Sequence, residues 1–434
     1  MKRKRFTPRL SLGTVIMLLF TFLVVLGCSW FMLRITGGDM ASRAAQLVES
    51  LKFAEDTPQP AQPREAEATL MPIVTMTPVP YASAAPTASP TPVPEKRTIT
   101  IAAAGSVYAP KAISQTVEEK GGADFTPVFA ALKDVFAPAD LAIVTMETLT
   151  AGSERGYDNY NTPAALLDAL RACGVDLVSL ATERALDKGY EGLTITMQEL
   201  VSRGMSYAGV SPDGENEIGL VRIGGVQVAV LAYSYGLSEE GKEKTDNDSH
   251  NMLADLELAN MQRDIAGARN QGADVVIVLP HWGTKNKQET PEVIRAMAQD
   301  LAKAGADVIL GTHPNVPQGI ERLSVTRPDG LTYETLVCYS LGSLLTDART
   351  PENTAGMAAA IDITYDPVTR RIALGDVQVT PLYIAKTKAE EKTAYRVVPA
   401  QDEAALAMLD SAEREAAKQA AAIVYEATGE AMQP

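Results

Sequence analysis

The feature that most constrains this chain is a strand–helix–strand pattern over residues 273–322, in which each strand runs directly into a histidine. Residues 275–279 are a short apolar, β-branched run closed by a proline, which predicts a buried strand ending at His281. Residues 308–310 predict a second strand, which ends just before His313. Between them, apolar residues recur at helical spacing at Val293, Ile294, Met297 and Leu301.

This unit determines where the two histidines lie. The crossover between two parallel strands of one sheet is almost always right-handed, and it brings both carboxyl ends to the same edge. Open α/β sheets place their sites at that edge, so the pattern predicts a metal or phosphate site at His281 and His313. The plainer alternative is that both histidines only anchor their loops.

Charge and cysteine content narrow the functional class. The net charge is −15 and the pI is about 4.8, so the chain lacks the basic footprint of a nucleic-acid-binding protein. The three cysteines supply neither a disulfide framework nor a CxxC zinc pair. With 46% hydrophobic residues, the chain has enough apolar surface for one large core or two ordinary ones.

The first residues predict a membrane anchor. Residues 1–9 carry five basic side chains and no acid, and we expect them in the cytoplasm. Residues 10–33 are apolar, uncharged and long enough to span a bilayer, so we place an anchor at residues 10–35, which predicts a single-pass protein of the cell membrane with an extracytoplasmic body. The alternative is a lipoprotein cleaved before Cys28.

Composition then divides the rest of the chain. Residues 36–97 are rich in Pro, Ala and Thr, as in PTASPTPVP, and predict a disordered linker. Residues 98–400 alternate strand and helix patterns in the first half and are rich in strand patterns in the second, which predicts a layered α/β domain with two sheets. Residues 401–434 are rich in Ala and Glu and predict a helical tail.

Several sequence blocks resemble one known family. The blocks ERALDKGYEGL, PHWG, AGADVILGTHPNVPQGIE and YSLGS occur in the order found in the bacterial capsule-synthesis CapA family, and the resemblance covers roughly residues 98–379. That family belongs to the calcineurin-like metallophosphatases and is tied to poly-γ-glutamate capsule production. The resemblance implies a four-layer α-β-β-α metallophosphatase-like sandwich, with the site at strand ends between the sheets.

The metal-binding pattern that this resemblance implies is altered at several positions, three of which concern the expected aspartate and histidine ligands. The first strand of the family ends in Gly-Asp, whereas this chain has Ser106. The third strand ends in Asn-Asn-His, whereas this chain has Glu183. The last block carries two histidines around a proline, and here the second is Asn315. A neutral hydroxyl is a poor substitute for a bridging carboxylate.

The retained residues still offer a donor set for one ion. The glutamate after the second strand is kept as Glu147, and His281 and His313 are both kept. We therefore expect at most one divalent ion, Mn, Zn or Mg, or no metal, and not the bridged pair of two-metal hydrolysis. The candidate ligands are Glu147, Glu183, His281, His313 and Asn315, and the candidate catalytic residues are His281 and His313.

The function implied by the resemblance is synthesis or export of an anionic capsule polymer such as poly-γ-glutamate. The expected partners are the membrane, the anionic polymer or capsule-synthesis membrane proteins, and no nucleic acid. Two alternatives stay open, namely a metal-dependent phosphoesterase or other hydrolase of the cell surface, and a non-catalytic exported scaffold. Lys285 and Lys287 could attract an anion, although exposed lysines usually have no specific role.

Overall fold

A computed structural model describes residues 94–119, 122–211, 218–245, 252–389 and 392–429. All of them belong to the second of two compact units, Ser89–Pro434. The predicted basic segment 1–9, the predicted anchor 10–35 and residues 36–93 of the predicted linker lie outside the described residues. In the described part of the chain, no helix has the length and hydropathy needed to cross a bilayer.

The larger sheet has eight strands and mixed direction. Its order is β16-β15-β14-β1-β4-β5-β6, with β13 pairing to β1 off this path. Strands β1, β4, β5 and β6 are parallel, so their carboxyl ends share one edge, while β14, β15 and β16 run antiparallel to their neighbours. The strands are β1 (Arg97–Val107), β4 (Leu141–Met146), β5 (Leu177–Ser179), β6 (Ser206–Ala208), β13 (Ser343–Leu345), β14 (Ala355–Asp366), β15 (Arg371–Ala389) and β16 (Lys392–Pro399).

The second sheet has six strands in the order β11-β12-β10-β9-β8-β7. Its four central strands are parallel, and β7 and β11 close the two edges antiparallel. The strands are β7 (Leu220–Ile223), β8 (Val226–Ser234), β9 (Val275–His281), β10 (Val308–Leu310), β11 (Ile320–Thr326) and β12 (Thr332–Cys338). A separate two-stranded sheet pairs β2 (Glu118–Glu119) with β3 (Gly122–Ala123).

The two large sheets face each other across one apolar core. Ile99 and Ile101 of the first sheet belong to the same buried cluster as Val228 and Ile277 of the second. At the hairpin between β7 and β8, a side chain added to Gly224 would meet the Ile99 Cγ2 at 3.2 Å, so glycine allows the sheets to approach closely there.

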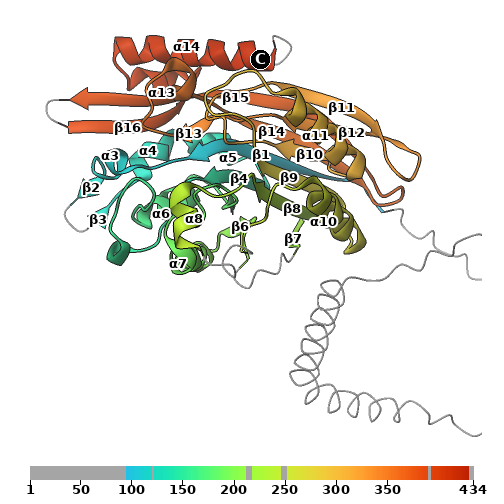
Figure 1. The fold of residues 1–434 in the computed structure, drawn as a ribbon. Coiled ribbons are helices and arrows are strands. Elements are labelled where there is room, and N and C mark those ends of the chain that lie inside the picture. Colours follow the sequence, from blue (N-terminus) through green and yellow to red (C-terminus); the bar gives the residue numbers. More distant parts are fainter. Residues whose placement is uncertain (1–93, 120–121, 212–217, 246–251, 390–391, 430–434) are drawn as a thin grey trace, which may run out of the picture. The chain divides into compact units, whose positions relative to one another are not determined.

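Helices cover the outer faces of this sandwich (Figure 1). The other face of the six-stranded sheet forms a second cluster with α10 and α11, as in the contact set of Val278, Ile265 and Leu301. On the eight-stranded sheet, Ala102 and Ala360 line a cavity together with Ala131 and Val135 of the helical segment before β4.

The helices and their bounds are as follows. They are α3 (Lys111–Ser114), α4 (Thr126–Phe129), the 3-10 turn η2 (Ala130–Leu132), α5 (Lys133–Phe136), the 3-10 turn η3 (Ser153–Arg155), α6 (Ala165–Ala172), α7 (Gly189–Ser202), α8 (Glu239–Lys244), α10 (Leu258–Asn270), α11 (Glu292–Ala304), α12 (Pro351–Thr354), α13 (Glu403–Ala407) and α14 (Ser411–Thr428). Asp410 caps the N-terminus of helix α14, because its carboxylate accepts hydrogen bonds from the amides of Ala412 and Glu413, and the helix lies along β15 and β14.

The α/β class with mixed sheets is confirmed, as is the strand–helix–strand unit, which is β9, α11 and β10 with β9 and β10 parallel. Three details of the prediction were wrong. Val293, counted on the apolar face of α11, is 66% exposed, and the buried face consists of Ile294, Ala298, Leu301 and Ala302. Strands β11 and β16 were not anticipated, and the strand pattern present in the sequence at residues 372–379 continues in β15 to Ala389.

Candidate metal centre

The candidate site lies at the carboxyl ends of strands from both sheets. His281 is the last residue of β9, and it pairs with Ser234 at the end of β8 and bridges to Thr312 after β10. His313 follows Thr312 directly. Glu183 comes from the loop after β5, in the other sheet. The parallel arrangement of these strands therefore brings together residues that are about a hundred positions apart in sequence.

Three of the predicted ligands converge to a small triangle of donor atoms. The Glu183 Oε2 lies 2.6 Å from the His281 Nε2, and the His313 Nδ1 lies 3.2 Å from the same nitrogen and 3.6 Å from the Glu183 Oε2. All three side chains are buried, with Glu183 only 2% exposed. Among the described residues, these three side chains form a group that could hold a metal ion, because one donor atom of each lies within 4.8 Å of the other two.

Two threonines orient His281. The Thr312 Oγ1 lies 3.0 Å from the His281 Nδ1, and it also donates a longer hydrogen bond, 3.5 Å, to the Thr145 Oγ1. With its Nδ1 held by the Thr312 hydroxyl, the His281 ring directs Nε2 at Glu183 and His313. The hydroxyl thus sets the ring orientation that a metal ligand needs.

Burial and neighbouring charged groups shift the pKa values of Glu183 and His313. Burial alone would raise the pKa of Glu183, but hydrogen bonds from His281 and His313 together with the charge of Lys285 hold it well below its usual range. Burial lowers the pKa of His313, and it outweighs the opposing effect of the Glu183 carboxylate. The carboxylate is therefore ionised, and the buried His313 resists protonation.

The remaining predicted positions lie beside this triangle rather than in it. Glu147 is 5% exposed, and its charge acts on the pKa values of His313 and Tyr235, yet it is not a member of the close donor group in the described chain. Ser106 is aligned with Thr145 on β4 and with Ser343 on β13. Within the described residues, neither the Ser106 Oγ nor the Glu147 Oε1 has a hydrogen-bonding partner.

Asn315 lies on a constrained turn. His313 and Asn315 both have positive φ values, 97° and 60°, which is strained for residues other than glycine. The carbonyl oxygen of Asn315 accepts hydrogen bonds from the Asn353 Nδ2 at 3.1 Å and the Ser343 Oγ at 3.3 Å, which hold this turn in place. The structure therefore fixes the backbone here, and ligation by the Asn315 side chain stays a prediction.

Sequence reasoning missed the other residues around the triangle. Of the two alternatives for Lys285, the structure shows contact with an anion, because its Nζ lies 2.5 Å from the Glu183 Oε1. Tyr235, one residue after β8, lies edge-on to His313 with ring centroids 4.5 Å apart, and burial raises its pKa to about 12. Arg184 lies over the Tyr160 ring at 4.0 Å and pairs with Asp187 at 3.1 Å. Of these residues, only Tyr235 had a sequence signal that could have pointed to the site, namely its position just after a strand.

The donor set fits one divalent ion. Donor atoms about 2.1 Å from a tetrahedral ion lie roughly 3.4 Å from one another. The observed separations of 2.6, 3.2 and 3.6 Å are close to that value, so small side-chain movements suffice. Two imidazoles and a carboxylate are also a donor combination that Zn and Mn accept. Bound there, an ion would supply Lewis-acid polarisation of an oxygen.

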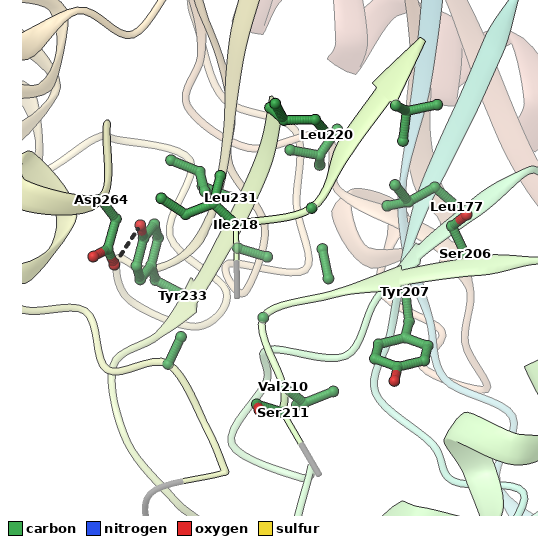
Figure 2. A pocket seen from close by; sticks show the side chains of 17 residues that line it. Leu177, Ser206, Tyr207, Val210, Ser211, Ile218, Leu220, Leu231, Tyr233 and Asp264 are labelled. Atoms are coloured by element: carbon green, nitrogen blue, oxygen red, sulfur yellow. Dashed lines mark hydrogen bonds between the residues drawn. The ribbon is translucent and has the colours of Figure 1, made fainter. Parts of the chain in front are cut away.

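A separate cavity of about 440 Å³ opens beside β6 and β8 (Figure 2). Leu177, Tyr207 and Leu231 form part of its wall, and the Tyr233 hydroxyl donates to Asp264 at 3.1 Å. It includes none of the triangle residues, and two of its lining residues, Ser211 and Ile218, flank the undescribed residues 212–217. The cavity is therefore not part of the candidate metal centre.

Comparison with known families gives one match that spans the whole site. The family model described as "Bacterial capsule synthesis protein PGA_cap" matches residues 100–348, which is more than half of the chain. This range includes every residue of the donor triangle and the positions Ser106, Glu147, Asn315 and Ser343.

Individual relatives have related descriptions. The chain is 23% identical to the PGA biosynthesis protein CapA of Bacillus subtilis over 56% of this chain and 62% of that protein. It is 25% identical to the capsule biosynthesis protein CapA of Bacillus anthracis over 41% of this chain and 42% of that protein. It is 28% identical to a probable polyglutamine synthesis accessory protein of Mycobacterium tuberculosis over 42% and 51%. The matched region thus spans less than two thirds of each relative.

Solved structures resemble the chain more distantly. A Haemophilus influenzae NAD nucleotidase aligns with a TM-score of 0.42 at 15% identity, covering 75% of this chain and 55% of that one. A calcineurin-like phosphoesterase from Bacillus subtilis aligns with a TM-score of 0.39 at 13% identity, covering 76% and 99%. Similarity at this level carries no information about substrate or chemistry.

Proposed function

The chain belongs to the bacterial capsule synthesis protein PGA_cap family, and from that membership we propose that it acts in the synthesis or export of an anionic capsule polymer such as poly-γ-glutamate. The observation that carries the proposal is the family match over residues 100–348, which includes the complete candidate centre. The relatives described as capsule or polyglutamine synthesis proteins support the same assignment.

The proposed role of the centre is to bind or assemble rather than to hydrolyse. Two-metal phosphoester hydrolysis needs a ligand that bridges two ions, and at the position where the resembled family has an aspartate this chain has the neutral Ser106. The donor triangle of Glu183, His281 and His313 suits a single divalent ion, which would leave a degenerate form of the metallophosphatase site.

We place the folded body outside the cytoplasm, on a membrane anchor at residues 10–35 followed by the linker 36–97. Protease added to cells stripped of outer layers should then release the body by cutting in the linker. The Cys28→Ser variant should stay attached to the membrane under this proposal, whereas its release would favour the lipoprotein alternative.

Deletion of the gene in its own bacterium tests the main proposal. The amount of cell-bound and released γ-linked glutamate polymer, measured after acid hydrolysis, should fall in the deletion strain and recover with the wild-type gene. A complementing gene that carries both His281→Ala and His313→Ala should fail to restore the polymer if the centre is needed. An unchanged polymer in the deletion strain would refute the assignment to capsule synthesis.

A metal-dependent hydrolase is the second candidate, and the buried Glu/His/His group is the observation that favours it. The purified protein should be assayed on a chromogenic phosphodiester with Mn, Zn and Mg. We expect little or no turnover. Brisk turnover that depends on His281 and His313 would favour the hydrolase, and an intact capsule phenotype with the double alanine variant would favour a non-catalytic scaffold.

A further inference from the structure

Lys285 is an exposed residue that reaches a buried carboxylate. It lies four residues after His281, and its side chain is 40% exposed, whereas that of Glu183 is 2% exposed. The Lys285 Nζ nevertheless lies 2.5 Å from the Glu183 Oε1. Holding a long lysine side chain in one geometry at a surface costs conformational entropy, so this contact is directed at the buried charge.

The two oxygens of Glu183 have different partners. Oε2 faces the two imidazoles, at 2.6 Å from the His281 Nε2 and 3.6 Å from the His313 Nδ1. Oε1 faces Lys285, with the Arg184 Nε further away at 4.0 Å. Arg184 is shared with Asp187, which it meets at 3.1 Å. Lys285 is therefore the cation committed to the second oxygen of the carboxylate.

A carboxylate can bridge two ions by placing one ion on each of its two oxygens. Here an ion between Glu183, His281 and His313 would use Oε2 and leave Lys285 on Oε1. An ion on Oε1 would have to displace the Lys285 ammonium and then lie close to another positive charge. Like charges at such short range repel strongly in a site with little water.

We infer that the ammonium of Lys285 takes the place of a second metal ion at Glu183, so that this centre holds no more than one divalent ion. The inference rests on the proposed one-metal centre and adds to Ser106 a second residue that limits its stoichiometry. It also explains how the buried carboxylate keeps a counter-charge when no metal is bound, since the side chain of Lys285 supplies it permanently.

The test compares metal binding by three variants of the full-length chain, purified in detergent and stripped with a chelator. Lys285→Met removes the charge, and Lys285→Arg keeps it. Lys287→Met is the matched control, because it removes an equal charge two residues away, and Lys287 is exposed and uses its backbone carbonyl to accept from the Gln318 Nε2. Mn and Zn stoichiometry is measured by elemental analysis, and affinity by titration calorimetry.

We expect at most one ion per wild-type chain. Lys285→Met should bind a second ion or hold the first at least about tenfold more tightly, since a nearby positive charge has gone. Lys285→Arg and Lys287→Met should stay within about twofold of the wild type. A melting curve for each variant verifies that it is folded.

Two outcomes would overturn the inference. One is a wild-type chain that already binds two ions. The other is a Lys285→Met variant whose stoichiometry and affinity equal those of the wild type, including the case in which neither binds metal. A variant that binds metal where the wild type does not would support it. These results come from metal binding by the purified chain, whereas the proposed function is tested by the amount of polymer in the deletion strain. Failure of the inference can therefore be distinguished from failure of the proposed function.

Discussion

The change Glu183→Gln is the sharpest probe of the centre, because it keeps the shape of the side chain and removes its charge. In the metal-free protein the carboxylate accepts from His281 at 2.6 Å and from Lys285 at 2.5 Å. A glutamine in the same place offers one carbonyl oxygen, so it can satisfy one of these donors. Its amide group would face the other donor without forming a hydrogen bond.

The expected loss follows from these contacts. A hydrogen bond to a charged group contributes about 1.5–3 kcal/mol, and leaving a buried charged partner uncompensated costs about 3–5 kcal/mol. Lys285 is 40% exposed and recovers part of its hydration, which places the expected destabilisation near 3 kcal/mol, at the lower end of that range. An unfolding entropy of roughly 0.7 kcal/mol per kelvin for a unit of this size converts that loss into a fall in Tm of about 4 °C.

Urea unfolding and calorimetry of the chelator-treated protein at pH 7 measure the effect. Glu154→Gln is the control, because Glu154 is exposed and the change should stay within about 0.5 kcal/mol. Because the pKa of Glu183 is depressed, its contribution is complete above the unfolded value of about 4.3 and is lost as the pH falls toward the folded value. The difference between wild type and variant should therefore persist at pH 5. A difference under about 0.5 kcal/mol at pH 7 would refute the reasoning.

Three further predictions separate the site from the scaffold. The pKa of buried His313 is depressed from 6.5, so the metal-free protein should lose stability as the pH falls below that value. His313→Gln should flatten this part of the stability–pH curve, and an unchanged slope would contradict the prediction. Thr312→Val should weaken metal binding about 10–100-fold in calorimetric titration, because His281 loses the hydroxyl that orients its ring. A change below twofold would count against this role. Asp307, at the opposite end of β10, is 1% exposed and accepts from Arg269 at 2.5 Å and Arg327 at 3.1 Å. Asp307→Asn should therefore lower the free energy of unfolding in urea by about 3 kcal/mol while metal affinity stays unchanged. Equal loss of stability and metal affinity would show that the two ends of β10 are coupled.

Much of the fold was visible in local sequence pattern. The β9–α11–β10 unit follows from a β-branched run, a helical repeat and a second apolar run. A histidine at the end of each of two parallel strands is itself a local feature, so the placement of His281 and His313 at one edge could be predicted. The extension of β15 to Ala389 and the edge strands β11 and β16 could not, because the neighbouring strands decide their pairing.

The donor triangle depended on the tertiary structure. The sequence by itself determined the α/β class, the family and the strand ends at which Glu183, His281 and His313 lie. Only the packing of two sheets decided that the Glu183 Oε2 meets the imidazoles while Oε1 meets Lys285, and that Glu147 lies beside this group. The physical reason is that strand ends are set by short-range periodicity, whereas a contact between side chains 98 residues apart depends on how the two sheets face each other.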